Sequence, residues 1–380
     1  MKKIFVGFIG LCIFVVGITS IRANALEKSD NVNGITLLTE EVPENLIRIV
    51  KGRLPYFDSI LLNSEGITSG DKDIGMPFSV YDDDINQTYY YFPLYHEGNI
   101  IKTIFCFSEN GKWQTNMSGY LIRELETLFT EKINVNIKVG FLQKNSDMYL
   151  IDEHQNLFLF NDSPLSEGFV SPSELKLSNF NFRTLTNECE NKFIFSLSTD
   201  SQTIDRLSKA YGQKYLNLDF LENQGKTSWC AAYATTAIIR YQTRKSFPTA
   251  RQMMTTLYPS SSNLADESAS NIQCISYANS YGFHSISNRW GTATAEGTML
   301  EINANRPYWV SALKQTRGKD RHAFVVRGYA NFDFYKTISV WNPWSNSSYG
   351  YDLLDPSSHL ISTHGVVFKQ DSGLFSWHYL

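Results

Sequence analysis

The chain has 380 residues, of which 42% are apolar, 14% aromatic and 19% charged. This composition is that of a globular protein and excludes a wholly disordered or collagen-like chain. The net charge of −4 is too small to indicate nucleic-acid binding through charge alone. Residues 26–200 carry 14 Lys and Arg against 26 Asp and Glu, a net charge of −12, whereas residues 201–380 carry 17 against 12, a net charge of +5. The length and this charge break predict two bodies of opposite sign.

The first 25 residues are typical of a secretory signal peptide. Lys2 and Lys3 precede an apolar run from Ile4 to Ile18, and Ala23-Asn24-Ala25 resembles a cleavage site. The run is short for a membrane span of about 20 residues. We therefore expect a secreted protein that is soluble and has no membrane association once the signal peptide is removed.

Four cysteines follow this segment, at positions 106, 189, 230 and 274. Three complete disulfide pairings are possible, and each would consume Cys230. Four cysteines are few for a disulfide scaffold of this length, so we expect a free thiol. Cys106 and Cys189 are left as either free or paired, and Cys274 is expected to be a buried helix residue.

Residues 26–200 are rich in polar and aromatic residues and carry strand-like runs between polar turns. One helix is expected from Leu121 to Phe129. The region contains no repeat and no motif with recognisable chemistry, so it predicts a β-rich domain with one or two helices. The runs that predict strands are Tyr89–Phe92, Ile100–Phe107, Ile133–Phe141, Met148–Ile151 and Leu157–Phe160.

A polar stretch from Ser196 to Thr203 lies at the charge break and is typical of a linker open to proteolysis. Beyond it, helices are expected first and strands after, which is an α+β layout rather than alternating strands and helices. The expected helices are Trp229–Tyr241, Pro248–Leu257 with proline at the first helical position, Ser268–Tyr281 and Ala295–Ala304. The expected strands are Tyr308–Leu313, His322–Tyr329, Thr337–Trp341 and Gly365–Phe368.

Cys230 stands at the start of an Ala-rich helical run. Thr227 or Ser228 can cap that helix, which would place the thiol in the first turn, where the helix dipole lowers a thiol pKa. Taken alone, a small buried cysteine is the commoner interpretation. Gln224 changes the balance, because its side-chain amide and the backbone N–H of Cys230 could form a two-donor oxyanion hole.

A thiolate nucleophile also needs a base, and His322 is the best candidate among the seven histidines. It opens a predicted strand after a polar, Gly-containing loop. Asn342 follows 20 residues later in the segment Val340-Trp341-Asn342-Pro343-Trp344. Two antiparallel strands with a hairpin near Asn331 would bring both side chains together, so that the Asn342 carbonyl holds the imidazole in one orientation and Trp344 shields that bond from water.

The order Gln, Cys, His, Asn in these contexts resembles the staphopain family of secreted bacterial cysteine peptidases, a compact branch of the papain superfamily. The resemblance covers about residues 205–380. It rests on Trp229-Cys230-Ala231, on His322-Ala323 with Gly328, and on Trp341-Asn342-Pro343-Trp344, and the stretch from Met254 to Pro259 is similar too.

This resemblance implies a papain-like catalytic domain over residues 201–380, with a helical half and an antiparallel β half. Cys230 would be the nucleophile, His322 the base and acid, Asn342 its orienting partner and Gln224 the oxyanion donor. Residues 26–200 would be a β-rich inhibitory propeptide, so the protein would be made as a zymogen. The implied partners are protein or peptide substrates, the chain's own propeptide and a dedicated protein inhibitor.

The sequence also departs from the family's pattern. Arg321 stands where the family usually has Gly before the histidine. The spacing of 92 residues between Cys230 and His322 is shorter than the spacing of roughly 130–150 residues found in papain.

Two alternatives stay open at this point. One is another secreted Cys-His acyl transferase or amidase, such as a transglutaminase-like enzyme or a cell-wall hydrolase, although these usually orient the histidine with Asp. The other is a binding protein on an inactive papain scaffold, which the intact set of four residues disfavours. We expect no metal and no cofactor, because the histidines at positions 284, 359, 364 and 378 show no ligand spacing.

Overall fold

The computed structural model describes residues 35–68, 72–130, 137–161, 212–219, 221–315, 320–332, 335–345, 351–354, 360–363 and 366–379, with short pieces between 175 and 197. The predicted signal peptide and most of the predicted linker lie outside the described residues. No helix among these residues is long and apolar enough to cross a membrane.

The helices of the C-terminal region begin where side chains cap them. Thr249 and Gln252 form a reciprocal capping box at the second helix, which therefore starts after Pro248 rather than at it. Ser270 and Gln273 form the same arrangement at the third helix. The described helices of this region are α4 (Cys230–Thr243), α5 (Ala250–Leu257), α6 (Asn271–Asn279) and α7 (Ala295–Asn303), with a short 3-10 turn, η3, at Leu264–Asp266.

The strands of this region pair antiparallel around β15. β14 and β16 flank β15, and the hairpin predicted near Asn331 is present, because Asn331 pairs with Lys336. β19 pairs with β14 on one edge, and β13 and β18 pair with β19. The strands are β12 (Gln213–Tyr215), β13 (Ser287–Trp290), β14 (Tyr308–Lys314), β15 (Arg321–Asn331), β16 (Lys336–Trp341), β17 (Tyr351–Leu354), β18 (Leu360–Thr363) and β19 (Val366–Phe375).

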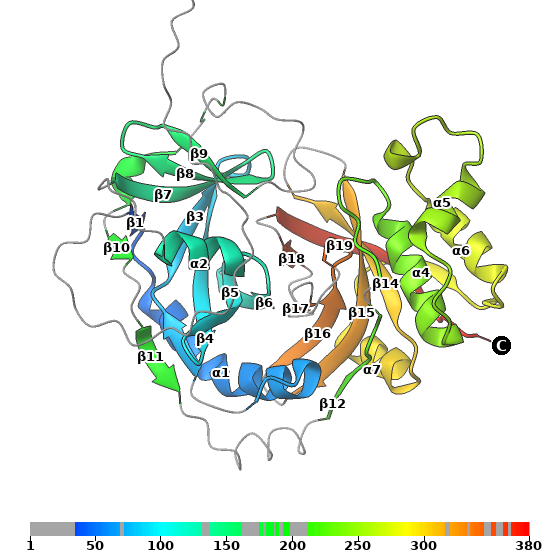
Figure 1. Ribbon diagram of the computed structural model, residues 1–380. Helices are drawn as coiled ribbons and strands as arrows, with labels where there is room; N and C mark the ends of the chain where they lie inside the picture. Colours follow the sequence, from blue (N-terminus) through cyan, green and yellow to red (C-terminus); the bar gives the residue numbers. More distant parts are fainter. Residues whose placement is uncertain are drawn as a thin grey trace, which may run out of the picture. The chain divides into compact units, whose positions relative to one another are not determined.

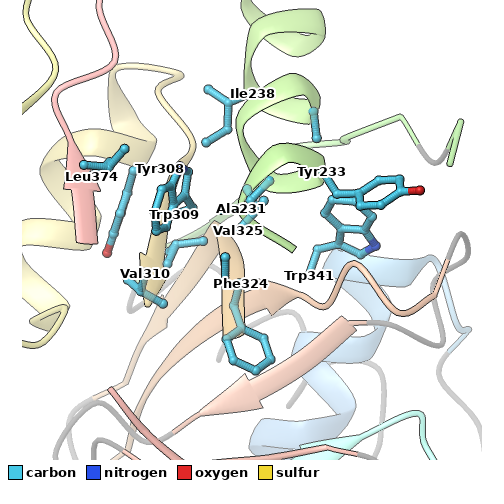
Figure 2. Packing of buried hydrophobic residues seen from close by; sticks show 14 of the residues in the cluster. Ala231, Tyr233, Ile238, Tyr308, Trp309, Val310, Phe324, Val325, Trp341 and Leu374 are labelled. Carbon is cyan, nitrogen blue, oxygen red and sulfur yellow. The ribbon is translucent and has the colours of Figure 1, made fainter. Parts of the chain in front are cut away.

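The core of this region lies between α4 and the sheet. The small side chains of α4 let the helix approach β14 and β15 closely, with Ala232, Ala234 and Ala237 fully buried. Figure 2 shows Ile238 of α4 and Trp309 and Val325 of the two strands in this cluster. In Figure 1, α5 and α6 lie beside α4 on the same side of these strands. This packing fixes the start of α4 against the start of β15.

The N-terminal region is β-rich, as its aromatic runs predict. The predicted helix at Leu121–Phe129 corresponds to α2 (Ile122–Thr130). The 22-residue helix α1 (Glu44–Glu65), which carries an internal Pro55, is not among the segments that the sequence patterns predict. The strands are β1 (Ile35–Thr39), β2 (Lys72–Gly75), β3 (Phe78–Asp82), β4 (Gln87–His96), β5 (Asn99–Glu109), β6 (Lys112–Ser118), β7 (Ile137–Lys144), β8 (Asp147–Asp152), β9 (Leu157–Asn161), β10 (Asn187–Cys189) and β11 (Phe193–Leu197), with a 3-10 turn, η2, at Phe182–Thr184.

The fold class predicted from the sequence is confirmed. A β-rich region comes first, and an α+β region follows in which α4, α5 and α6 precede the antiparallel strands β14 to β19. In the α+β region, β15 begins at Arg321 and β16 ends at Trp341, so the residues that follow β16 lie near the start of β15. This hairpin sets the positions of His322 and Asn342.

Candidate active site

Cys230 is the first residue of α4. The expected cap at Thr227 or Ser228 is wrong by one residue or more, because Trp229 occupies the N-cap position and makes no side-chain cap. The loop is held instead by η3: the indole N–H of Trp229 donates to Leu264 O at 2.8 Å, and Ser228 N donates to Ala265 O at 3.0 Å. The indole therefore replaces a side-chain cap in fixing the start of the helix.

The Cys230 thiol lies against the start of β15. Its Sγ donates to the carbonyl oxygen of Arg321 at 3.8 Å, and the side chain is partly exposed. Burial raises the pKa of the Cys230 thiol, while the backbone N–H groups of Ala323, Ala231 and Cys230 itself oppose that rise. The prediction that the helix start lowers the thiol pKa is wrong, because desolvation outweighs these backbone hydrogen bonds.

His322 directly follows Arg321, whose carbonyl oxygen accepts the hydrogen bond from the thiol. It is 1% exposed, and its Nε2 lies 2.8 Å from Asn342 Oδ1. Burial lowers the pKa of His322 to about 4, and the bond to Asn342 opposes that shift. The imidazole is therefore neutral near pH 7 and able to accept a proton.

Two further hydrogen bonds fix the orientation of the Asn342 side-chain amide relative to the imidazole ring. The backbone N–H of Trp344 donates to Asn342 Oδ1 at 3.0 Å, and Asn342 Nδ2 donates to Thr363 Oγ1 at 2.8 Å. The oxygen of Asn342 must then face the ring, so Nε2 of His322 carries the proton and donates it. His322 Nδ1 is buried without a hydrogen-bond partner among the described residues, so its lone pair is available.

Aromatic rings enclose the imidazole. Trp344 packs on it with ring centroids 4.3 Å apart, Phe324 meets it edge-on at 4.7 Å, and Phe368 lies at 5.7 Å. Trp344 itself is only 7% exposed. The bond between His322 and Asn342 is thereby kept out of water, which strengthens it.

Gln224 is buried in the turn before α4 and is tied to the segment that follows β16. Its backbone N–H donates to Pro343 O at 2.8 Å, so the loops carrying Gln224 and Asn342 are directly joined. Its Nε2 donates to Thr227 O at 2.5 Å. That bond uses one of the two amide hydrogens and fixes the amide plane.

Comparison with known proteins shows which family model and which relatives this chain matches. Residues 207–364 match the family model described as staphopain peptidase C47. Staphopain B of Staphylococcus aureus (strain MSSA476) is 20% identical over 361 residues, which cover 90% of this chain and 87% of that protein. An extracellular cysteine protease of Staphylococcus epidermidis (strain ATCC 12228 / FDA PCI 1200) is 21% identical over 366 residues, which cover 90% of this chain and 89% of that protein.

Residues 207–364 form a staphopain peptidase C47 domain. The chain is a cysteine peptidase, a hydrolase that acts on peptide bonds. The resemblance drawn from the motifs around Cys230, His322 and Asn342 is confirmed at the level of the family. The staphopain domain has the α+β layout described above.

Within the staphopain domain, sequence reasoning did not find every residue that supports the histidine. Thr363, Phe324 and Phe368 all contact the pair formed by His322 and Asn342. Phe324 stands two residues after His322 on the same strand, so alternation along β15 could have suggested it. Thr363 and Phe368 come from β18 and β19, and no local pattern links them to the histidine.

Cys106 and Cys274 are buried and free. Cys274 packs on α6 as predicted, with its Sγ 4.0 Å from Ala231 O, and burial raises its pKa to about 12. Cys106 is buried in β5, and burial raises its pKa far above the ordinary value. Neither thiol is suited to be a nucleophile near pH 7. Among the described residues there is no group of three metal-ligating side chains.

Proposed function

We propose that this chain is a secreted cysteine endopeptidase, made as a zymogen, that cleaves protein substrates through a thioester on Cys230. The observation that carries this proposal is the buried bond between His322 Nε2 and Asn342 Oδ1, which leaves Nδ1 as an acceptor next to the residues that contact Cys230 Sγ. Export is proposed from the predicted signal peptide, and one relative is described as extracellular.

Each step of the reaction has a named donor and acceptor. His322 Nδ1 takes the proton of Cys230, and the thiolate attacks the scissile carbonyl carbon. The resulting imidazolium gives its proton to the leaving amine as the carbon–nitrogen bond breaks. A water molecule, deprotonated by His322, then attacks the thioester and releases the carboxylic acid and the thiol.

The charge that develops on the carbonyl oxygen needs donors already in place. The backbone N–H of Cys230 at the helix start and the second amide hydrogen of Gln224 are the proposed pair. Gln224 is 4% exposed and joined to Thr227 and Pro343. Its donor therefore needs little reorganisation when the oxyanion forms.

Replacing Gln224 with alanine should lower kcat roughly 10²–10³-fold, the usual cost of one oxyanion donor, with little change in KM. Steady-state cleavage of a fluorogenic peptide measures this. Gln213→Ala, which removes a half-buried amide on β12 that bonds Ser59 Oγ, is the matched control and should retain activity. Full kcat in Gln224→Ala would remove the oxyanion role.

The N-terminal region contacts the strands that support the proposed catalytic pair, Cys230 and His322. Asn116 Nδ2 of β6 donates to Leu360 O of β18 at 3.0 Å, and β6 also pairs with β17 at Met117 and Leu353. β18 ends with Thr363, which binds Asn342. β6 therefore contacts β18, the strand whose Thr363 binds the proposed orienting residue Asn342.

A second area of contact involves α1 and the β15–β16 hairpin. Phe57 meets Tyr335 edge-on with ring centroids 5.7 Å apart, and Tyr56 lies 4.9 Å from Phe332. Arg327, fully buried on β15, donates to Ser64 O in the last turn of α1 at 3.3 Å, where the helix dipole favours a cation. This contact is mainly apolar, so it supports tight docking that does not depend on net charge.

The N-terminal region, residues 26 to about 200, is proposed as an inhibitory propeptide that is released by cleavage near residues 196–203. Added back in trans, it should inhibit the cleaved enzyme, because its apolar contacts re-form. Opposite net charges should speed the encounter, so raising the salt should lower the association rate more than it raises the dissociation rate.

Thiol-probe labelling of the intact chain and of the cleaved enzyme tests this role. Cys230 should react more slowly in the intact chain. Equal labelling rates would contradict the proposal that the N-terminal region restricts access to Cys230. An association rate that is unchanged between low and high salt would remove the electrostatic contribution.

Casein digestion with and without a thiol-directed epoxide tests the proposed function as a whole. The cleaved protein should digest casein, and the epoxide should stop it. Transfer of acyl groups to amines without hydrolysis would indicate an acyl transferase instead, and no turnover with bound substrate would indicate an inactive binding protein.

A further inference from the structure

Arg321 immediately precedes His322 and contacts the proposed nucleophile through its backbone. Its carbonyl oxygen accepts the Cys230 Sγ hydrogen bond at 3.8 Å. Its guanidinium makes two bonds to the Asp371 carboxylate, both at 2.7 Å, and Nη1 also donates to Ser311 Oγ at 3.3 Å. The charge that the sequence alone places next to the histidine is therefore neutralised by one carboxylate in a bidentate geometry.

An irregularity in β19 aims Asp371 at this arginine. Ser311 of β14 pairs with Ser372, whereas the next residue, Ala312, pairs with Gln370, so Asp371 is the extra residue between two register pairs. Such bulges re-aim one side chain and are frequent beside active sites. Asp371 O also accepts a hydrogen bond from Gly291 N at 2.7 Å, which ties the bulge to the end of β13.

Trp290, the last residue of β13, lies near the same guanidinium. Its ring centroid is 5.9 Å from Arg321 Cζ, and it stands opposite Ser372 in the β13–β19 pairing. The indole is 80% exposed. A large aromatic surface held beside a neutralised ion pair can bury an apolar side chain, whereas an acidic side chain there would meet the carboxylate of Asp371.

The position of this cluster fits a bound peptide. An extended peptide advances about 3.3 Å per residue, and an arginine side chain spans about two such steps. Because the Arg321 carbonyl contacts Cys230 Sγ, a substrate held at the thiol would reach Trp290 within about three or four residues of the scissile bond.

We propose that Trp290 and the Arg321–Asp371 pair form a substrate subsite that selects a large apolar side chain and rejects an acidic one. In this subsite Trp290 supplies the contact surface, and Asp371 masks the charge of Arg321. The inference rests on the proposed peptidase function and adds the class of side chain that the site recognises.

The first test compares Trp290→Ala with Leu300→Ala, using the full-length chain processed to its active form and a peptide library varied within four residues of the cleaved bond. Leu300 is the matched control, because it is 72% exposed and lies on α7, whose neighbours Glu296 and Asn303 contact Lys336 and Tyr329 far along the hairpin from Arg321. Trp290→Ala should lower kcat/KM for large apolar side chains at one position roughly tenfold relative to alanine, whereas Leu300→Ala should not.

The second test removes the carboxylate charge that neutralises Arg321. Asp371→Asn should raise kcat/KM for peptides with Glu at that same position about fivefold relative to Leu, and the gain should shrink as salt is raised. The double variant Asp371→Asn with Arg321→Gln should lose the gain, because the unmasked charge is gone.

Unchanged selectivity in both Trp290→Ala and Asp371→Asn, with an active wild type and an inactive Cys230→Ala, would overturn the subsite and leave the proposed function standing. Absence of cleavage by the wild type would overturn both. Trp290→Ala provides a test free of folding effects, because the indole is largely exposed.

Discussion

Cys230→Ala should abolish peptide-bond hydrolysis, because no other thiol of the described residues lies at a helix start next to a base. Cys230 is partly exposed at the first position of α4, and alanine favours helices. The variant should therefore remain folded, with a change in unfolding free energy of about 1 kcal/mol or less. Cleavage of a fluorogenic peptide and a thermal melt measure the two effects.

Cys274→Ala is the matched control for the nucleophile. Cys274 is fully buried on α6, so its loss can reduce stability, but its raised pKa makes it unreactive near pH 7. The expected result is nearly full activity at a temperature well below the melt. An inactive Cys274→Ala together with an active Cys230→Ala would overturn the assignment of the nucleophile.

His322→Ala should be as inactive as the nucleophile variant. His322 is the side chain whose Nδ1 is left without a partner by the bond from Nε2 to Asn342, so its removal leaves Cys230 with a raised pKa and no proton acceptor. Asn342→Ala should lose less activity, because Asn342 orients the ring rather than taking the proton. Measured kcat values that rank Asn342→Ala below His322→Ala would contradict these roles.

His322 should also affect how the unfolding free energy depends on pH, and this effect can be measured without an activity assay. Burial lowers the pKa of His322 from its ordinary value of 6.5 to about 4, so between these values the unfolded chain binds a proton that the folded chain does not. The unfolding free energy should then fall as pH drops from 6.5 to 4, and fall less steeply in His322→Ala. Denaturant melts at several pH values measure both slopes.

Local patterns predicted the parts of this site that a strand or a helix start carries. Strand alternation and the hairpin between His322 and Asn342 were accessible because residues close in sequence form them. The partner that holds the Asn342 amide in this orientation was not accessible, because Thr363 lies 21 residues further on and on another strand.

The helix start at Cys230 illustrates the second limit. Sequence preference pointed to Thr227 or Ser228 as the cap, but Thr227 Oγ1 donates to Gln224 O at 2.9 Å and the indole of Trp229 reaches Leu264. A tertiary contact across 35 residues therefore outweighed the local capping preference. In the same way, no local pattern pairs Arg321 with Asp371, since the two residues are 50 positions apart.

Mapping a single covalent adduct tests whether Cys230 is the nucleophile and His322 its base. The active protein is treated with a thiol-directed epoxide, the residual casein cleavage is followed over time, and the modified peptide is identified by mass spectrometry. We expect one adduct per chain, on Cys230, forming in step with the loss of activity and far more slowly in His322→Ala. An adduct on any other cysteine at full inhibition, or full labelling of Cys230 with cleavage intact, would contradict this assignment.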